Sequence, residues 1–148
     1  MFQHLSHAPV TSGMMELAGI ALSMFLACSY CATFIGEQFH ISVFCDSKPV
    51  VDFALQEGQH DAGARHLTAL VAYVRAHVDE LRNAGHVVEL GWAPRETRGI
   101  QRAHELAAQN PWPSTSSMWP NNLYDLLLGA SQVYAAASSQ EREIMDSI

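Results

Sequence analysis

The sequence has few charged residues, and basic residues are the scarcest. Only 16% of its 148 residues are charged, and eight Lys and Arg stand against fifteen Asp and Glu, which gives a formal net charge of -7. A chain this acidic does not coat nucleic acid or an anionic membrane by bulk attraction, so such a partner would need a local basic face. With 49% hydrophobic residues, the chain is too apolar to be intrinsically disordered, and its length fits one globular domain.

Cysteines are also few. The three cysteines, Cys28, Cys31 and Cys45, are an odd number without a disulfide framework, so we expect an intracellular, reducing compartment, either the cytoplasm or the nucleus. The spacing of Cys28 and Cys31 would allow a metal or redox pair. However, the sequence has no second such pair and no nearby pair of histidines to complete a four-ligand zinc site. We therefore favour a structural role for these thiols.

One hydrophobic run is long enough to need an explicit interpretation. Residues 17–35 are nineteen residues without a charge, which is the length at which a helix can cross a bilayer. No Lys or Arg precedes Lys48, so neither a signal sequence nor a span with positive flanks is indicated, and small and polar residues dilute the run. We expect a buried core helix and no membrane contact, and a small membrane-inserted protein is the alternative.

Hydrophobic periodicity divides the chain into helices and strands. Apolar residues at offsets of three and four predict a helix over residues 66–83, ended by Gly85. Two β-rich runs, HISVFC at residues 40–45 and HVVELGW at residues 86–92, predict strands. Further helices are expected at residues 14–31, capped by Thr11 or Ser12, and at residues 49–56, 99–109 and 123–137.

This order predicts an α/β fold. Strands at residues 41–45 and 86–91, joined through helices, should be parallel neighbours in a truncated mixed sheet that is flanked by helices. Pro, Ser and Trp at residues 111–120 indicate a linker. We therefore expect a domain over residues 1–110 and a C-terminal helical tail over residues 121–148.

Three segments together resemble a known family. They are MMELAGIALSM (residues 14–24), ISVFCDSKPVVDFAL (residues 41–55) and WAPRETRGIQRAHELA (residues 92–107). Their order and spacing are similar to those of the type-1 ribonuclease H domain, as found at the end of non-LTR retrotransposon polyproteins. The resemblance implies a ribonuclease H-like fold that lacks the family's first three strands. It also implies a retroelement origin and, as substrate, the RNA strand of an RNA–DNA hybrid, which such domains bind by backbone shape and 2′-hydroxyls.

The resemblance also implies site residues. Glu16 and Asp46 match two of the four carboxylates with which the family holds two Mg²⁺ ions for phosphodiester hydrolysis. The fourth position falls on His104, and the first has no counterpart. We therefore expect Glu16, Asp46 and His104 as catalytic residues and Glu16 and Asp46 as metal ligands. Mg²⁺ binding should be weak, and cleavage of the hybrid weak or absent.

Two surfaces could contact partners. Arg95, Arg98 and Arg102 fall within eight residues and are the predicted nucleic-acid-binding rim, although such a trio is also typical of a solvated surface. Without the family's first strands the sheet should have an open edge, which invites self-association. Residues 2–7 are the nearby segment able to pair there. A non-catalytic protein-interaction fragment is therefore the rival to a nucleic-acid domain.

Overall fold

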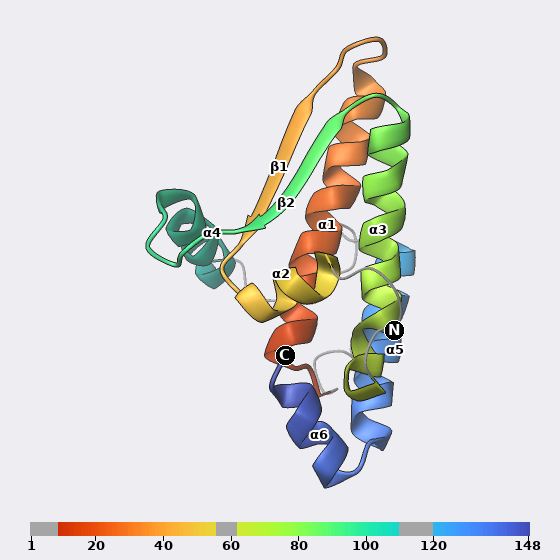
Figure 1. The fold of residues 1–148 in the computed structure, drawn as a ribbon, viewed down its shortest axis with the longest axis vertical. Coiled ribbons are helices and arrows are strands. Elements are labelled where there is room, and N and C mark those ends of the chain that lie inside the picture. Colours follow the sequence, from red (N-terminus) through yellow and green to blue (C-terminus); the bar gives the residue numbers. More distant parts are fainter. Residues whose placement is uncertain (1–8, 56–61, 110–119) are drawn as a thin grey trace.

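The computed structural model describes residues 9–55, 62–109 and 120–148, in which two strands are set among several helices (Figure 1). The short 3₁₀ segment Ala62–Leu67 leads into α3. In chain order the other elements are α1 (Ser12–Thr33), β1 (His40–Cys45), α2 (Lys48–Leu55), α3 (Thr68–Asn83), β2 (Val87–Trp92), α4 (Arg98–Gln109), α5 (Asn121–Ala136) and α6 (Ser139–Asp146).

The two strands form a parallel sheet, as the strand–helix–strand pattern predicted. His40 is in register with Val87, and Cys45 with Trp92. Gly85 has φ = +97°, a conformation that glycine adopts at little cost, and this lets the chain leave α3 and enter β2. Within the described residues the sheet is two-stranded. The result is a mixed α/β fold with far more helix than strand.

In the part of the chain that the structure describes, one face of the sheet is covered and the other is exposed. Alternate residues of β1 are more buried, whereas His40, Ser42 and Phe44 are exposed. On this outer face Glu89 lies 3.3 Å from both His40 Nε2 and Ser42 Oγ. Parallel sheets are usually buried on both faces. Among the described residues, no second layer covers the outer face of this sheet. Residues 2–7, which we expected near an edge, lie outside the described residues.

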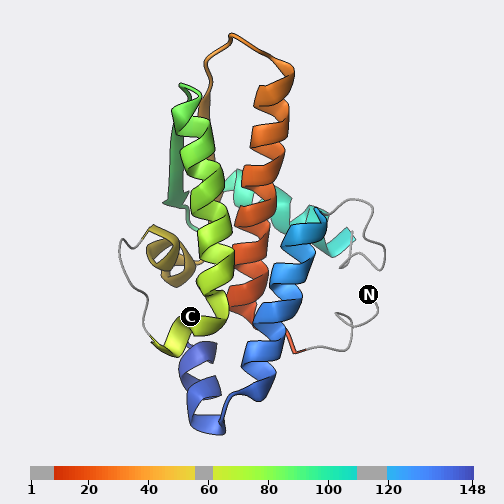
Figure 2. The same cartoon turned by 90° about the vertical axis from the view of Figure 1, so that its right-hand side faces the viewer.

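Helix α1 is the centre of the core. The Thr11 hydroxyl accepts a hydrogen bond from the Met14 backbone N–H at 3.1 Å, which identifies Thr11 as the cap. The helix packs against α3 and α5, and the three run side by side (Figure 2). Fully buried side chains from all three meet in one apolar cluster, including Met14, Leu17, Met24, Leu70, Val71, Leu123 and Leu127.

By length and mean hydropathy, 1.6 over its most apolar window, α1 could also cross a membrane. The same length and composition suit the core helix that it forms here, since 39% of that window is buried inside the fold. A buried core helix and a membrane span are both helical, so the presence of the helix does not distinguish these two interpretations of residues 17–35.

The C-terminal segment is helical, as expected, but its packing was not predicted. Leu123 and Leu127 of α5 are completely buried in the same cluster as α1 and α3. Helix α6 starts with a capping box in which the Ser138 side chain and Glu141 bond reciprocally. The expected linker lies almost wholly outside the described residues. Helix α5, which follows the expected linker in sequence, therefore packs into the same core as α1 and α3.

Candidate functional site

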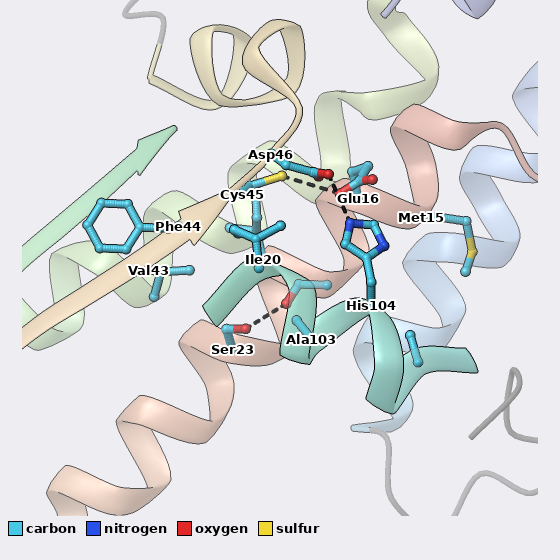
Figure 3. Close-up of a pocket in the computed structure, with 13 residues that line it drawn as sticks. Met15, Glu16, Ile20, Ser23, Val43, Phe44, Cys45, Asp46, Ala103 and His104 are labelled. Carbon is cyan, nitrogen blue, oxygen red and sulfur yellow. Dashed lines mark hydrogen bonds and ion pairs between the residues drawn. The ribbon is translucent and has the colours of Figure 1, made fainter. Parts of the chain in front are cut away.

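Three sequence-predicted site residues converge on one cavity of about 350 Å³ (Figure 3). Glu16 comes from the first turns of α1, Asp46 follows the end of β1, and His104 lies on α4. The cavity floor is apolar, with Ile20 and Ile100 among the lining residues. The carboxyl ends of parallel strands lie at the same edge of the sheet, and α/β proteins commonly bind ligands there. The expected proximity of Glu16 and Asp46 is confirmed, because their carboxylate oxygens lie within 4.8 Å of each other.

Asp46 is the most tightly held group of this site. Its side chain is only 7% exposed, and one oxygen, Oδ2, lies 2.9 Å from His104 Nε2 and 3.2 Å from Arg95 Nε. Because a carboxylate only accepts hydrogen bonds, both nitrogens donate to it. The bond from His104, helped by that from Arg95, holds the pKa of Asp46 below its usual value against the effect of burial. Asp46 is therefore an ionised carboxylate whose charge is already compensated.

Glu16 has a different partner. The Cys45 thiol donates to Glu16 Oε2 across 3.3 Å, and the Ser47 backbone N–H donates to the same sulfur at 3.4 Å. Burial, and then the neighbouring Glu16 carboxylate, raise the pKa of Cys45 to about 12. Cys45 is therefore a neutral thiol in this site and not a nucleophilic thiolate.

The three predicted arginines come from two different segments of the chain. Arg95, in the loop after β2, is paired with Asp46 inside the site. Arg98 and Arg102 lie four residues apart on α4 and therefore share a helix face. That face is opposite to the one that carries Ile100 and His104 into the cavity. Arg102 is itself 3.2 Å from Glu105. Arg95 therefore pairs with Asp46 next to the cavity, whereas Arg98 and Arg102 lie on the outer face of α4. Nucleic-acid binding by the three arginines stays a prediction.

Sequence reasoning missed the place of Cys45 in the site and the pairing of Arg95 with Asp46. Cys45 was considered only as a structural thiol, yet its sulfur lies within 4.8 Å of the carboxylates of Glu16 and Asp46. Its position directly before Asp46 was the available signal. The pairing of Arg95 with Asp46 had no such signal, because it depends on the conformation of the loop after β2. Trp92 also holds the backbone of Asp46 in place, since its Nε1–H donates to the Asp46 backbone oxygen at 3.1 Å.

The donor set does not fit a pair of Mg²⁺ ions. Mg²⁺ takes hard oxygen ligands in near-octahedral geometry, and Glu16 and Asp46 are the carboxylates gathered here among the described residues, with a thiol as the third group. One of the two carboxylates is already paired with Arg95. The two residues could hold one largely hydrated ion, as expected for weak binding. We therefore derive no cleavage step through metal ions.

Comparison of the chain with protein-family models, with curated proteins and with solved structures finds no match.

Proposed function

We propose that the chain is a ribonuclease H-type nucleic-acid domain that binds RNA–DNA hybrids and cleaves them weakly or not at all. One observation carries the proposal. Glu16, Asp46 and His104 come from three segments far apart in the sequence and line one cavity at the end of a parallel sheet. These are the residues that the resemblance to the retroelement ribonuclease H domain selects. Fold and residue placement thus support the same interpretation.

Charge explains why little cleavage is expected. Two Mg²⁺ ions bring four positive charges, and hydrolysis needs them close together at the scissile phosphate. Glu16 and Asp46 supply two negative charges, and Arg95 offsets one of them at 3.2 Å. The pocket therefore attracts divalent ions much less than a site with four free carboxylates would.

Binding would use the exposed face of α4. Arg98 and Arg102 lie on this face, and Arg102 is 62% exposed. Guanidinium groups pair well with phosphate oxygens, and two arginines one helical turn apart can follow a backbone strand. Because the rest of the chain is acidic, this face must carry most of the attraction.

Anisotropy of a fluorescent RNA–DNA hybrid tests the binding. We expect the double variant Arg98→Ala and Arg102→Ala to bind more weakly and to lower the dependence of log Kd on log salt by about one for each lost phosphate contact. Arg65→Ala is the control, since Arg65 is exposed and paired with a carboxylate, as Arg102 is, but lies outside α4. Equal affinity of the double variant and the wild type would refute the proposed binding face.

Cleavage of the same hybrid in millimolar Mg²⁺ tests the second half of the proposal. We expect activity at least about a hundredfold below that of an intact family member, a loss of roughly 3 kcal/mol of transition-state stabilisation. Rapid cleavage that disappears in Asp46→Asn would show that the site is active and that our charge argument is wrong.

Self-association is a second candidate function, favoured by the sheet. Phe44 on the outer face is 54% exposed, and Val87, near the other end of the strand pair, is 48% exposed. Both strands of the described sheet lack a second neighbour. Exposed edges and apolar sheet residues favour pairing between chains. Sedimentation velocity over a range of protein concentrations tests this, and a monomer at every concentration would exclude it.

A further inference from the structure

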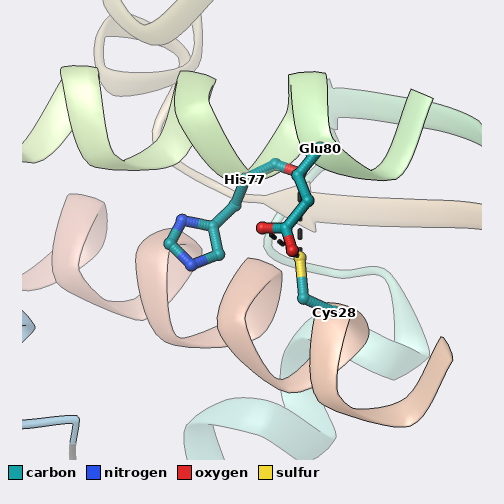
Figure 4. Close-up of side chains that lie close together, drawn as sticks. All are labelled: Cys28, His77 and Glu80. Carbon is teal, nitrogen blue, oxygen red and sulfur yellow. Dashed lines mark hydrogen bonds between the residues drawn. The ribbon is translucent and has the colours of Figure 1, made fainter. Parts of the chain in front are cut away.

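A second cluster of chemically active side chains lies away from the cavity, between α1 and α3 (Figure 4). Cys28 projects from α1, and His77 and Glu80 project from α3, where a spacing of three residues places them on one face. One donor atom from each residue lies within 4.8 Å of one donor atom from each of the others. Sulfur, nitrogen and oxygen donors are thus gathered on two helices that pack directly against each other.

The hydrogen bonds around the cluster leave donors free for an ion. His77 Nδ1 lies 2.9 Å from the Tyr73 backbone oxygen. A carbonyl only accepts, so Nδ1 carries the proton and Nε2 keeps its lone pair. This backbone contact is the arrangement that commonly orients a metal-binding histidine. The Cys28 thiol has only long contacts, 3.7 Å to the His77 backbone oxygen and 3.9 Å to Glu80 Oε2.

The donor set favours a particular class of metal. Zinc accepts Cys, His and carboxylate ligands together, at about 2.0–2.3 Å, whereas Mg²⁺ and Ca²⁺ avoid thiolates. Ligand atoms at these distances in a tetrahedron lie about 3.5 Å apart. The three donor atoms must therefore move about 1 Å closer to one another for zinc to bind. Glu80 is exposed and Cys28 and His77 are half-buried, which leaves room for the rotation.

A neighbouring cavity has room for a water molecule beside Cys28 and Glu80. Cys28, Cys31, Glu80 and His86 line a hollow of about 130 Å³, which is large enough for a water molecule. Without an ion, burial and the Glu80 charge raise the pKa of Cys28 to about 11. A bound cation would reverse this effect and release the thiol proton.

We propose that Cys28, His77 and Glu80 bind a zinc ion, with water as the fourth ligand, and that the ion links α1 to α3. Three protein ligands plus water are the donor set of an open zinc site. The ion would hold together two core helices whose ligands are 49 to 52 residues apart in sequence. This site does not depend on the proposed nucleic-acid function.

Co²⁺, which replaces zinc and is coloured, is the probe for the first experiment. Titration of the metal-free, reduced protein should give one tetrahedral Co²⁺ per chain with a thiolate-to-cobalt absorption band. Cys28→Ser should lose the band, whereas Cys31→Ser and Cys45→Ser should keep it. The Cys45 control matters because Cys45 lies beside Glu16 and Asp46. Absence of the band in the wild type with excess Co²⁺, or its persistence in Cys28→Ser, would overturn the proposal.

Competition with a zinc chelator is the second experiment, and it tests the ligands on α3 without substituting the thiol. His77→Gln and Glu80→Gln should each weaken Zn²⁺ binding by at least about tenfold, the range in which loss of even a supporting group acts. Zn²⁺ at a hundred times its Kd should raise the Tm of the wild type by about 5 °C or more. It should leave the Tm of Cys28→Ser unchanged. Equal zinc affinity in wild type and both variants would show that α3 supplies no ligand.

Discussion

Arg95 limits how strongly the candidate site can bind a divalent ion, and its removal should make binding tighter. Arg95 Nε lies 3.2 Å from Asp46 Oδ2, and its side chain is 76% exposed. Because the Mg–O bond measures about 2.1 Å, an ion on that oxygen would lie no more than about 5 Å from the guanidinium. In a water-like dielectric the divalent ion and the Arg95 guanidinium would repel each other by about 1.7 kcal/mol. Physiological salt reduces this to about 1 kcal/mol.

We therefore expect Arg95→Gln to lower the Kd of Mn²⁺, used as a spectroscopic substitute for Mg²⁺, by about fivefold. Electron paramagnetic resonance of free Mn²⁺ measures the change directly. Arg98→Gln is the matched control, because it removes the same charge from the outer face of α4 and should leave the Kd within about twofold. Unchanged Mn²⁺ affinity in Arg95→Gln, or an equal gain in both variants, would refute the argument that the Asp46 ion pair competes with the metal.

Three further predictions concern stability. Asp46 has a lowered pKa in the fold, so the stability it contributes is present above its usual pKa and is lost as pH falls through its folded pKa. Urea unfolding at several acidic pH values should therefore show a smaller loss of unfolding free energy with falling pH in Asp46→Asn than in the wild type. An identical pH dependence in the two proteins would contradict this. Leu127→Ala should cost about 2–5 kcal/mol because Leu127 is fully buried, whereas Leu26→Ala, at a site 55% exposed, should cost much less; similar unfolding midpoints would mean that α5 is not part of the core. Gly85→Ala should cost about 1 kcal/mol, because φ of +97° disfavours a side chain; an unchanged Tm would be inconsistent with this turn.

The sequence predicted those elements whose composition or hydrophobic periodicity is distinctive. Runs rich in β-forming residues located β1 and β2, and the intervening helices implied parallel pairing, which the register of His40 with Val87 confirms. The buried face of α3 was likewise visible, since Leu70, Val71 and Val74 are all in the core. Hydrophobic periodicity gives the apolar face of a helix but not its partner. For that reason the packing of α5 against α1 and α3 was not foreseen.

The site was only partly predictable, for a related reason. Position in a motif identified Glu16 and Asp46, and the fold brings them together. The partners of a side chain depend on contacts between distant segments, such as Arg95 with Asp46, 49 residues apart. The same applies to Cys28, whose neighbour Glu80 is 52 residues away. The short spacing of Cys28 and Cys31 in the sequence suggested that these two thiols form a pair. In the structure, the metal-binding side chains grouped with Cys28 are His77 and Glu80 of α3.

Helix α1 carries one ligand of each proposed site, and its geometry keeps the two sites independent. Glu16 and Cys28 are twelve residues apart on it, which is about 18 Å along the helix axis. This exceeds the Debye length of about 8 Å in physiological salt, so a charge gained at one site has little effect on ion binding at the other. Their donors also differ, because carboxylates favour hard ions and a thiolate favours zinc or cobalt. Mn²⁺ and Co²⁺ titrations therefore report on separate parts of the molecule, and failure of either proposal leaves the other standing.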